Sequence, residues 1–382
     1  MKKSFILRIS LFSLVFLTIS CAPRPDEQVT AAFRQTASLP ATSNQTFDTL
    51  LRKRANALKV STVGLYHEVD NIALKELYLG SDIDENSLFQ AASMSKAVAA
   101  AGILSLAKEK EISPDDDIRP YIEILDWNDV PGGDKPVTLR ELLSHTAGAN
   151  VSGFLGYPKG RAIPTNLQVV KGIRPANSKR VRLDGNKGEF AYSGGGYQIA
   201  QLFAESVSGQ PFPLMMKRLM LAPLGMTKSF FDDNLDTDKI APLAVAAAQA
   251  GIFPVEGWPL ILRNSWNNYP EAAAAGLWTT PKDYAKFARA LMVAADGEVP
   301  EGLSKDVADL MLTNVTSSYG LGLGFTDWGD PALRRFGHGG SNRGYKCLFG
   351  VVPSKREIIV IMTNAPGGSA LTNEVLIGLT TE

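Results

Sequence analysis

The sequence predicts an α+β fold in which one antiparallel sheet is built from N- and C-terminal segments of the chain. Two segments of strand-forming residues, 59–68 and 73–79, lie near the N-terminus, and four more, 320–328, 333–338, 344–352 and 357–363, lie in the C-terminal third. Between these groups, residues 112–270 contain helical patterns, such as those over 139–144, 196–208 and 213–221, separated by loops rich in glycine and proline. This order is typical of a sheet flanked by helices, with a mainly helical lobe inserted between the two groups of strands.

The first residues have the pattern of an export signal. Basic residues precede an apolar run, 9–19, which is too short to span a bilayer but has the length of a secretory signal. We therefore expect residues 1–21 to act as a signal peptide. The mature protein is expected to be exported to the cell envelope and to face the periplasm or the exterior.

The end of the apolar run predicts a lipid anchor. It reads Leu17-Thr18-Ile19-Ser20-Cys21, which resembles the lipobox of bacterial lipoproteins, where the cysteine receives the lipid. Thr18 departs from that pattern, which more often has leucine there. Cys347 is the only other cysteine, so a lone cysteine directly after the signal favours lipidation at Cys21 over a disulfide. The expected partner is then a membrane, and an ordinary signal peptide cleaved nearby is the alternative.

The folded domain is predicted to occupy residues 46–382, with its helical lobe at about 112–270. Residues 22–45 are rich in proline, threonine, serine, glutamine and aspartate and show no periodicity, so we expect a flexible tether there. The domain is predicted to begin with an amphipathic helix over 46–58, followed by a hairpin that turns at Asp70-Asn71.

A buried helix is predicted over 93–111, because this segment is rich in alanine and apolar on nearly every side. Ser93 and Lys96 lie one turn apart where it begins. A serine becomes a nucleophile when a neighbouring base takes its proton, and a lysine at i+3 is within reach. Ser105 and Lys108 repeat the spacing in mid-helix, where no free N–H groups can stabilise an oxyanion. An N-cap serine beside a solvated lysine is the alternative interpretation.

Two glycine-rich segments are further candidates for a site. The first is Tyr192-Ser193-Gly194-Gly195-Gly196-Tyr197, where a tyrosine can approach a site closely and transfer a proton. A turn flanked by two core tyrosines would give the same pattern. The second, 336–342, ends a predicted strand, and its glycines expose backbone N–H groups to a substrate. A strand bend beside a surface histidine, His338, is the alternative there.

The charge pattern does not suggest nucleic acid as a partner. Lys and Arg number 39, Asp and Glu also number 39, and no basic run follows the N-terminus, so the electrostatic signature of a nucleic-acid-binding protein is missing. The three histidines, His67, His145 and His338, lack the close spacing of a zinc motif. We expect His145 to be a structural hydrogen-bonding residue in its turn.

Three motifs, in this order, resemble those of the penicillin-recognising serine hydrolases: Ser93-Met94-Ser95-Lys96, Tyr192-Ser193-Gly194 and His338-Gly339-Gly340. Within that superfamily, the chain is similar to the branch that holds class C β-lactamases, D-alanyl-D-alanine carboxypeptidases, D-aminopeptidases and related esterases. The similarity runs from about residue 48 to the end of the chain. It includes three connecting segments: Leu142-Leu143-Ser144-His145-Thr146-Ala147-Gly148, Leu224-Gly225-Met226 and Ala275-Gly276-Leu277-Trp278-Thr279-Thr280.

The resemblance implies a β-lactamase/transpeptidase-like fold and a role for each matched residue. Ser93 would be the acylated nucleophile, Lys96 a buried lysine that shares its proton, and Tyr192 the group that takes the serine proton and passes it to the leaving group. The backbone N–H groups of Ser93 and Ser341 would form the oxyanion hole. No metal or cofactor is implied, and the partner is a small-molecule or peptide substrate. The implied substrate-binding residues are Gly194, His338, Gly340 and Ser341.

Two departures from the motifs limit the predicted substrate. Gly194 stands where asparagine is usual, and the asparagine amide contacts the acylamino group of β-lactams and peptides. His338 stands where β-lactamases usually have lysine, and a histidine is not reliably charged at neutral pH. The sequence therefore predicts a serine hydrolase that acts through an acyl-enzyme on an ester or amide, of the esterase, D-peptidase or weak β-lactamase type. A catalytically silent lipoprotein of the same fold, which binds peptidoglycan fragments or a protein partner, is the alternative.

Overall fold

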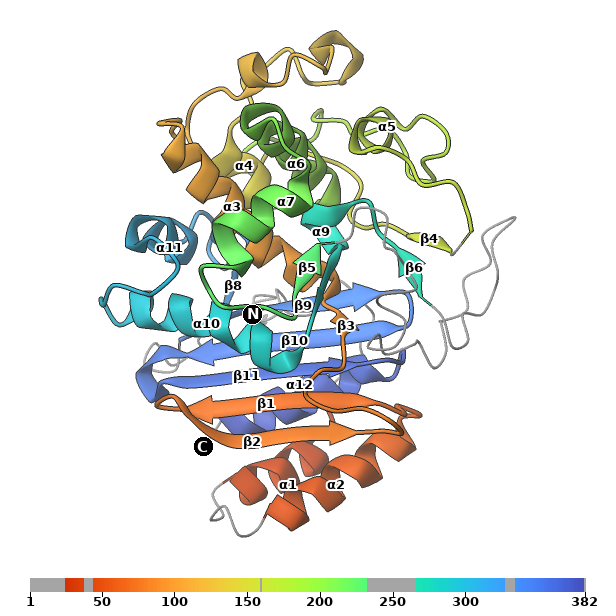
Figure 1. Cartoon of the computed structure of the whole chain (residues 1–382), viewed down its shortest axis with the longest axis vertical. Helices are drawn as coiled ribbons and strands as arrows, with labels where there is room; N and C mark the ends of the chain where they lie inside the picture. Colours follow the sequence, from red (N-terminus) through yellow and green to blue (C-terminus); the bar gives the residue numbers. More distant parts are fainter. Residues whose placement is uncertain (1–24, 38–43, 159, 232–265, 327–333, 381–382) are drawn as a thin grey trace, which may run out of the picture.

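The computed structural model of the 382-residue chain describes residues 25–37, 44–158, 160–231, 266–326 and 334–380. Within these residues the main sheet has six antiparallel strands in the order β2-β1-β11-β10-β9-β8 (Figure 1). Val63 on the second strand of this order is paired with Thr363 on the third, so the two ends of the chain meet in one sheet. The predicted fold class is confirmed. The strands are β1 (Val63–Val69), β2 (Ile72–Leu79), β8 (Gly324–Thr326), β9 (Arg335–Asn342), β10 (Tyr345–Val352) and β11 (Glu357–Thr363).

The predicted hairpin between β1 and β2 is confirmed. Asp70 and Asn71 have φ angles of 52° and 63°, and Val69 is paired with Ile72 across the turn. Two central residues with positive φ are the signature of a two-residue type I′ turn, which matches the twist of the flanking strands. Asp and Asn accept this conformation more readily than other L-residues.

Strand β9 is longer than predicted. It was expected to end near His338, but it continues to Asn342, and His338 and Gly340 are paired with Phe349 and Cys347 of β10. The glycines therefore do not bend the strand, because the ladder to β10 holds it straight through them.

Both faces of the sheet are buried. Alternate residues of β11 contribute to two apolar clusters, with Val360 and Met362 in one and Ile359 and Ile361 in the other. A strand covered on both faces reads as a continuous apolar run, as β11 does. Helix α10 (Pro281–Ala295) and the helical lobe cover one face (Figure 1). Helices α1 (Glu27–Ala37), α2 (Asn44–Ala57) and α12 (Gly368–Thr380) cover the other.

Helix α1 corrects the prediction of a flexible tether over 22–45. Its buried residues Thr30, Phe33 and Thr36 recur every three positions, and the ring centroid of Phe33 lies 5.4 Å from that of Phe47 in α2. A Cβ atom at Gly378 in α12 would lie 2.4 Å from Phe33 Cβ, so α1 and α12 are in close contact. The helical period was overlooked because two of the three buried residues are threonines. The predicted signal peptide, 1–21, and Cys21 lie outside the described residues.

The helical lobe surrounds α3, the predicted buried helix. A Cβ atom at Gly102 would lie 2.3 Å from Met216 Sδ, so the small residues of α3 allow close packing as expected. The helices predicted over 139–144, 196–208 and 213–221 are present, although the last changes to a π-helix at Lys217. The helices are α3 (Ser95–Glu109), α4 (Leu139–Leu143), α5 (Asn166–Lys171), α6 (Gly194–Ser208), α7 (Phe212–Met216), α9 (Ala272–Ala275) and α11 (Lys305–Leu312).

Two small sheets lie between the main sheet and the lobe. One has the order β3-β7-β5 and the other pairs β4 with β6. Their strands are β3 (Phe89–Gln90), β7 (Leu277–Thr279), β5 (Phe230–Phe231), β4 (Tyr157–Pro158) and β6 (Asn267–Asn268).

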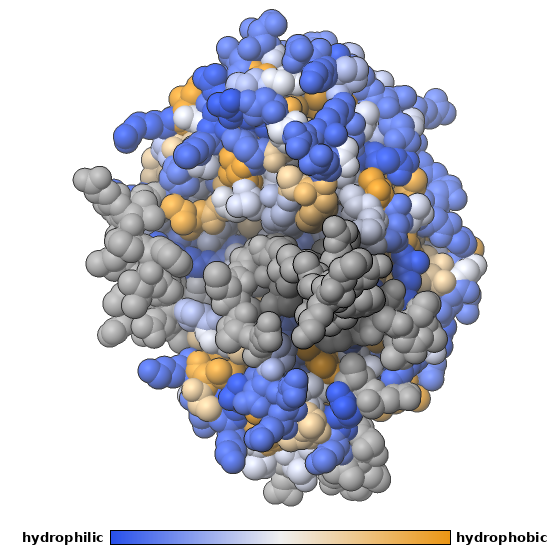
Figure 2. All heavy atoms as spheres, turned by 180° about the vertical axis from the view of Figure 1, so that it is seen from behind, coloured by the Kyte–Doolittle hydropathy of each residue, from blue (hydrophilic) through white to orange (hydrophobic). Residues whose placement is uncertain are grey.

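On the face seen in Figure 2, the residues in colour are mostly hydrophilic, and the hydrophobic ones form small separate patches. Among the described helices, none has both the length and the apolar character that crossing a bilayer requires.

Candidate active site

Ser93 lies in a strained turn directly before α3. The α-helix begins at Ser95, two residues later than predicted, and Ser93 is the middle residue of a 3₁₀ turn, Ala92–Met94. Ala92 has a φ angle of 50°, in the left-handed region that costs a non-glycine residue about 1–3 kcal/mol. Ser93 is 8% exposed. Such strain persists only where surrounding contacts impose it, and it is concentrated at functional sites.

Lys96 is buried against Ser93. Its Nζ atom lies 3.1 Å from Ser93 Oγ and donates to the carbonyl oxygen of Ala274 in α9 at 2.8 Å. The ring centroids of Tyr192 and Tyr197 lie 5.1 and 5.5 Å from Nζ. Within the described residues, no carboxylate forms a hydrogen bond or ion pair with this amine, and burial lowers the pKa of Lys96 to about 7. A substantial fraction of Lys96 is therefore a neutral amine at neutral pH.

Tyr192 lies beside this pair as a neutral phenol. Its hydroxyl oxygen is buried and makes no well-aligned hydrogen bond with the described residues. Burial raises the pKa of Tyr192, and the nearby Ser93 side chain lowers it by a smaller amount. A raised pKa keeps the phenol protonated, so Tyr192 gives up its proton only to a stronger base, such as a departing alkoxide. Before Tyr192 could act as the predicted base toward Ser93, it would first have to lose its own proton.

Strand β9 brings the third motif against the turn that carries Ser93. A Cβ atom at Gly340 would lie 2.2 Å from the carbonyl oxygen of Ala91, so only glycine permits this approach. Asn342 Nδ2 donates to Gln90 Oε1 at 2.8 Å and to the carbonyl oxygen of Ala275 at 3.2 Å, which ties β9 to β3 and α9. The Ser341 hydroxyl accepts from Lys346 Nζ on β10. The oxyanion role of the Ser341 N–H group remains a prediction.

A chain of four hydrogen bonds links two histidines through Tyr319. The Ser193 N–H donates to His145 Nδ1 at 3.0 Å, which leaves the proton of a neutral ring on Nε2, 3.2 Å from the Tyr319 hydroxyl. That hydroxyl lies 3.0 Å from His338 Nε2 and can donate to it, while His338 Nδ1 donates to the Gly339 carbonyl oxygen at 2.6 Å. All donors and acceptors of the chain are then satisfied with both histidines neutral.

Burial keeps these histidines uncharged. It lowers the pKa of His145 well below its ordinary value and that of His338 to about 3, and the charge of Lys96 adds to both effects. His338 is 4% exposed, so the alternative of a surface histidine is wrong. Because both of its ring nitrogens are engaged, His338 supplies no cation for a substrate carboxylate. His145 is the structural hydrogen-bonding residue that was predicted.

Tyr319→Phe is expected to lower the free energy of unfolding by about 1–3 kcal/mol. The change removes one hydroxyl and leaves His145 Nε2 and His338 Nε2 buried without partners, and an unsatisfied buried polar group costs about that much. Urea denaturation measures the change. Tyr121→Phe is the matched control, because Tyr121 is 40% exposed, and it should change stability by less than about 0.5 kcal/mol. An equally small change in Tyr319→Phe would contradict the hydrogen-bond chain.

Gly194 is the first residue of α6, and an aromatic ring covers it. Ser193 caps the helix, with its Oγ atom accepting from the Gly196 N–H at 3.1 Å. A Cβ atom at position 194 would lie 2.7 Å from Phe154 Cε2. The place that an asparagine side chain would need is therefore taken by Phe154.

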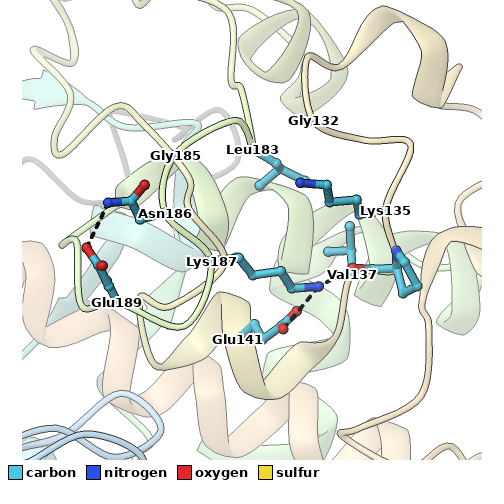
Figure 3. A pocket seen from close by; sticks show the side chains of 11 residues that line it. Gly132, Lys135, Val137, Glu141, Leu183, Gly185, Asn186, Lys187 and Glu189 are labelled. Atoms are coloured by element: carbon cyan, nitrogen blue, oxygen red, sulfur yellow. Dashed lines mark hydrogen bonds and ion pairs between the residues drawn. The ribbon is translucent and has the colours of Figure 1, made fainter.

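A cavity of about 340 Å³ lies in the helical lobe, away from the candidate catalytic residues (Figure 3). Lys187 crosses it to form an ion pair with Glu141 at 3.1 Å and donates to the Pro136 carbonyl oxygen at 2.5 Å. Asn186 Nδ2 donates to Glu189 Oε2 at 2.8 Å. Neither Ser93 nor Lys96 lines this cavity, and two of its charged groups, Lys187 and Glu141, are paired with each other.

Three contributors to the site were missed by the sequence analysis. Tyr319 precedes a predicted strand without any motif around it, and Phe154 lies in a loop whose conformation no pattern specifies. The group that holds Lys96 in place is the backbone carbonyl of Ala274, which no side-chain pattern reports. Tyr197, for which the sequence predicted no role in the site, also contacts Lys96 through its ring.

The sequence of the chain matches one protein-family model and several known proteins. Residues 69–382 match the model of the Beta-lactamase family. Penicillin-binding protein 4 of Amycolatopsis lactamdurans is 26% identical over 332 residues, which are 82% of this chain and 81% of that protein. Esterase EstB of Burkholderia gladioli is 27% identical over 214 residues, 52% of this chain and 53% of that protein. Across the first curated relatives, the chain spans between 53% and 81% of their length.

Among solved structures, the octameric penicillin-binding protein homologue from Pyrococcus abyssi superposes with a TM-score of 0.66. It is 21% identical, and the alignment covers 86% of this chain and 76% of that one. This likeness shows a shared fold.

Proposed function

The chain belongs to the beta-lactamase family of serine hydrolases, and on that basis we propose that it cleaves an ester or amide through an acyl-enzyme formed on Ser93. The observation that carries the proposal is the contact of 3.1 Å between Ser93 Oγ and Lys96 Nζ, both buried, with the pKa of the lysine lowered to about 7. A nucleophile beside a base that is neutral at working pH is what acyl transfer requires.

In the acylation step, the neutral amine of Lys96 takes the proton of Ser93 as Oγ attacks the substrate carbonyl carbon. The carbonyl oxygen becomes an oxyanion, which the N–H groups of Ser93 and Ser341 are proposed to bind. Tyr192 then donates its proton to the departing alcohol or amine and receives one from the Lys96 ammonium group. Water next attacks the acyl-enzyme, with its proton passing to Lys96, and Ser93 recovers its proton as the acid leaves.

The pH dependence should follow Lys96. Below a pKa of about 7 the lysine is an ammonium group without a free electron pair, so kcat/KM for an ester is expected to rise from pH 5 to pH 8 and then level off. Burial lowers the pKa of both His145 and His338, that of His338 to about 3, so the rise is attributed to Lys96. A pH–rate profile with a uniformly reactive ester measures the midpoint. A profile that falls between pH 6 and pH 8 would contradict Lys96 as the base.

Esters are the proposed substrate class. One relative carries the name esterase, and Gly194 provides no amide for an acylamino group. The test compares p-nitrophenyl esters, D-Ala-D-Ala peptides and nitrocefin. We expect a burst of p-nitrophenol equal to the enzyme concentration, a mass increase on the peptide that contains Ser93, and weak or absent turnover of nitrocefin. Robust nitrocefin turnover would show that Gly194 does not limit the substrate as proposed. If neither turnover nor a mass increase on the Ser93 peptide were found, the alternative of a catalytically silent protein that binds peptidoglycan fragments or a protein partner would be favoured.

Export and lipidation at Cys21 are also proposed, on the strength of the N-terminal sequence pattern. Bacteria grown with radiolabelled palmitate are expected to incorporate label into the wild type and not into Cys21→Ser. Label retained in that variant would contradict an anchor at this cysteine.

A further inference from the structure

The loop 150–156 is fixed against the start of α6. The carbonyl oxygen of Asn150 accepts from Ser193 Oγ at 2.5 Å, and that of Val151 accepts from the Gly195 N–H at 3.0 Å. Farther along, the carbonyl oxygen of Leu155 accepts from Asn267 Nδ2 at 2.8 Å. Hydrogen bonds before and after Phe154 therefore hold its position.

The backbone of this loop is strained at Val151. Its φ angle is 62°, a conformation that β-branched residues rarely adopt. Contacts around the loop must impose this conformation. At Val151 the contact is the hydrogen bond that its carbonyl oxygen accepts from the Gly195 N–H in α6. The loop and the start of α6 are therefore built as one unit, two residues from Tyr192.

Within this unit, Phe154 lies over Gly194. The distance of 2.7 Å from Phe154 Cε2 to the place of a Cβ atom at 194 leaves room for hydrogen alone. The ring is half-buried and packs against the main apolar core. The Val151 carbonyl, 3.4 Å from the same place, already accepts a hydrogen bond from α6. A substrate group reaching this side of Tyr192 meets a ring and a glycine, and neither side chain offers a polar group.

We propose that Phe154 and Gly194 form an apolar wall for the acyl group of the substrate. The preferred substrates are then esters with an unbranched hydrocarbon acyl chain, and esters with an amide at the same place in the chain are disfavoured. An amide placed against this wall would lose its hydrogen bonds to water without gaining others, whereas a methylene group gains from leaving water. This inference rests on the proposed function and specifies its substrate class.

The test uses two esters of equal chain length, p-nitrophenyl pentanoate and p-nitrophenyl N-acetylglycinate. Each kcat/KM is divided by the rate constant for hydroxide hydrolysis of the same ester, which removes the difference in intrinsic reactivity. The wild type is expected to prefer the pentanoate by about tenfold or more. Phe154→Ala should lower the pentanoate value by about tenfold and change the N-acetylglycinate value by less than about threefold. Phe154→Leu keeps an apolar wall and should keep the preference.

The matched control is Leu155→Ala, in the same loop, because Leu155 is 38% exposed and its bond to Asn267 uses the backbone. This variant should leave the ratio of the two esters unchanged. If Phe154→Ala lowered kcat/KM equally for both esters, so that their ratio did not change, the inference would be overturned. Labelling with a fluorophosphonate probe distinguishes a failure of the proposed function from a failure of this inference alone. A wild type that the probe does not label overturns the proposed function and this inference with it. Full labelling without any preference between the esters overturns the inference alone.

Discussion

Ser93→Ala is expected to lower kcat/KM for p-nitrophenyl esters by about 10⁴- to 10⁶-fold and to abolish fluorophosphonate labelling. The substitution removes the only atom that can carry the acyl group in the proposed reaction. Among the described residues, the other groups in contact with the Lys96 amine are the Ala274 carbonyl and the rings of Tyr192 and Tyr197, and burial raises the pKa of the Tyr192 phenol, which keeps it protonated. Because Ser93 is small and 8% exposed, its loss should leave the melting temperature close to that of the wild type.

The chain contains its own control for this experiment. Ser105 and Lys108, farther along α3, have the same spacing as Ser93 and Lys96, but Lys108 pairs with Asp306 at the surface and Ser105 Oγ faces Met220 Sδ. Ser105→Ala should keep full labelling and turnover. If Ser93→Ala retained labelling, or if Ser105→Ala lost it, the assignment of the nucleophile would be wrong.

Lys96→Met is expected to lower kcat/KM by about 10²- to 10⁴-fold, the usual contribution of a positioned general base. Methionine has nearly the length of lysine but no proton acceptor of comparable strength. The carbonyl oxygen of Ala274 loses its donor, which costs stability, while the buried amine no longer has to be removed from water, which offsets that cost. Thermal unfolding is therefore expected to change little. The measurement is kcat/KM at pH 8 together with the melting temperature.

Lys108→Met is the matched control, because it removes a lysine from the same helix whose amine forms a surface ion pair, and it should leave kcat/KM unchanged. Lys96→Met with activity within tenfold of the wild type would contradict Lys96 as the base. In that case Tyr192 would have to take the serine proton, and its pKa would have to fall when substrate binds.

The parts of the fold that could be predicted from the sequence are those specified by local pattern. The segments of strand-forming residues, the Asp70-Asn71 turn and the alanine-rich helix each depend on neighbouring residues, and each is present. Helix α1 was missed because its buried face uses Thr30 and Thr36, whose burial depends on α12, a partner more than three hundred positions away.

The candidate site, too, could be predicted from the sequence only in part. The spacing of Ser93 and Lys96 placed the two side chains in contact, as predicted. The lowered pKa of Lys96 and the raised pKa of Tyr192 come from burial by several elements at once, which no single motif encodes. Tyr319 joins His145 to His338 only because the fold brings α4, β9 and a loop together. The predicted role of Tyr192 as the base came from the motifs alone, whereas the buried environment of Lys96 and Tyr192 is the reason for proposing Lys96 in that role.

The pairing of β1 with β11 has a consequence for how the chain reaches its final form. Val63 finds its partner in Thr363, so the middle of the sheet joins segments from nearly opposite ends of the chain. Closing so long a loop is entropically costly and slow, and it cannot start before β11 has left the ribosome. While the chain is incomplete, β1 and β2 remain a two-stranded hairpin, which is marginally stable in water. The complete six-stranded sheet can therefore form only after its last strand has been synthesised.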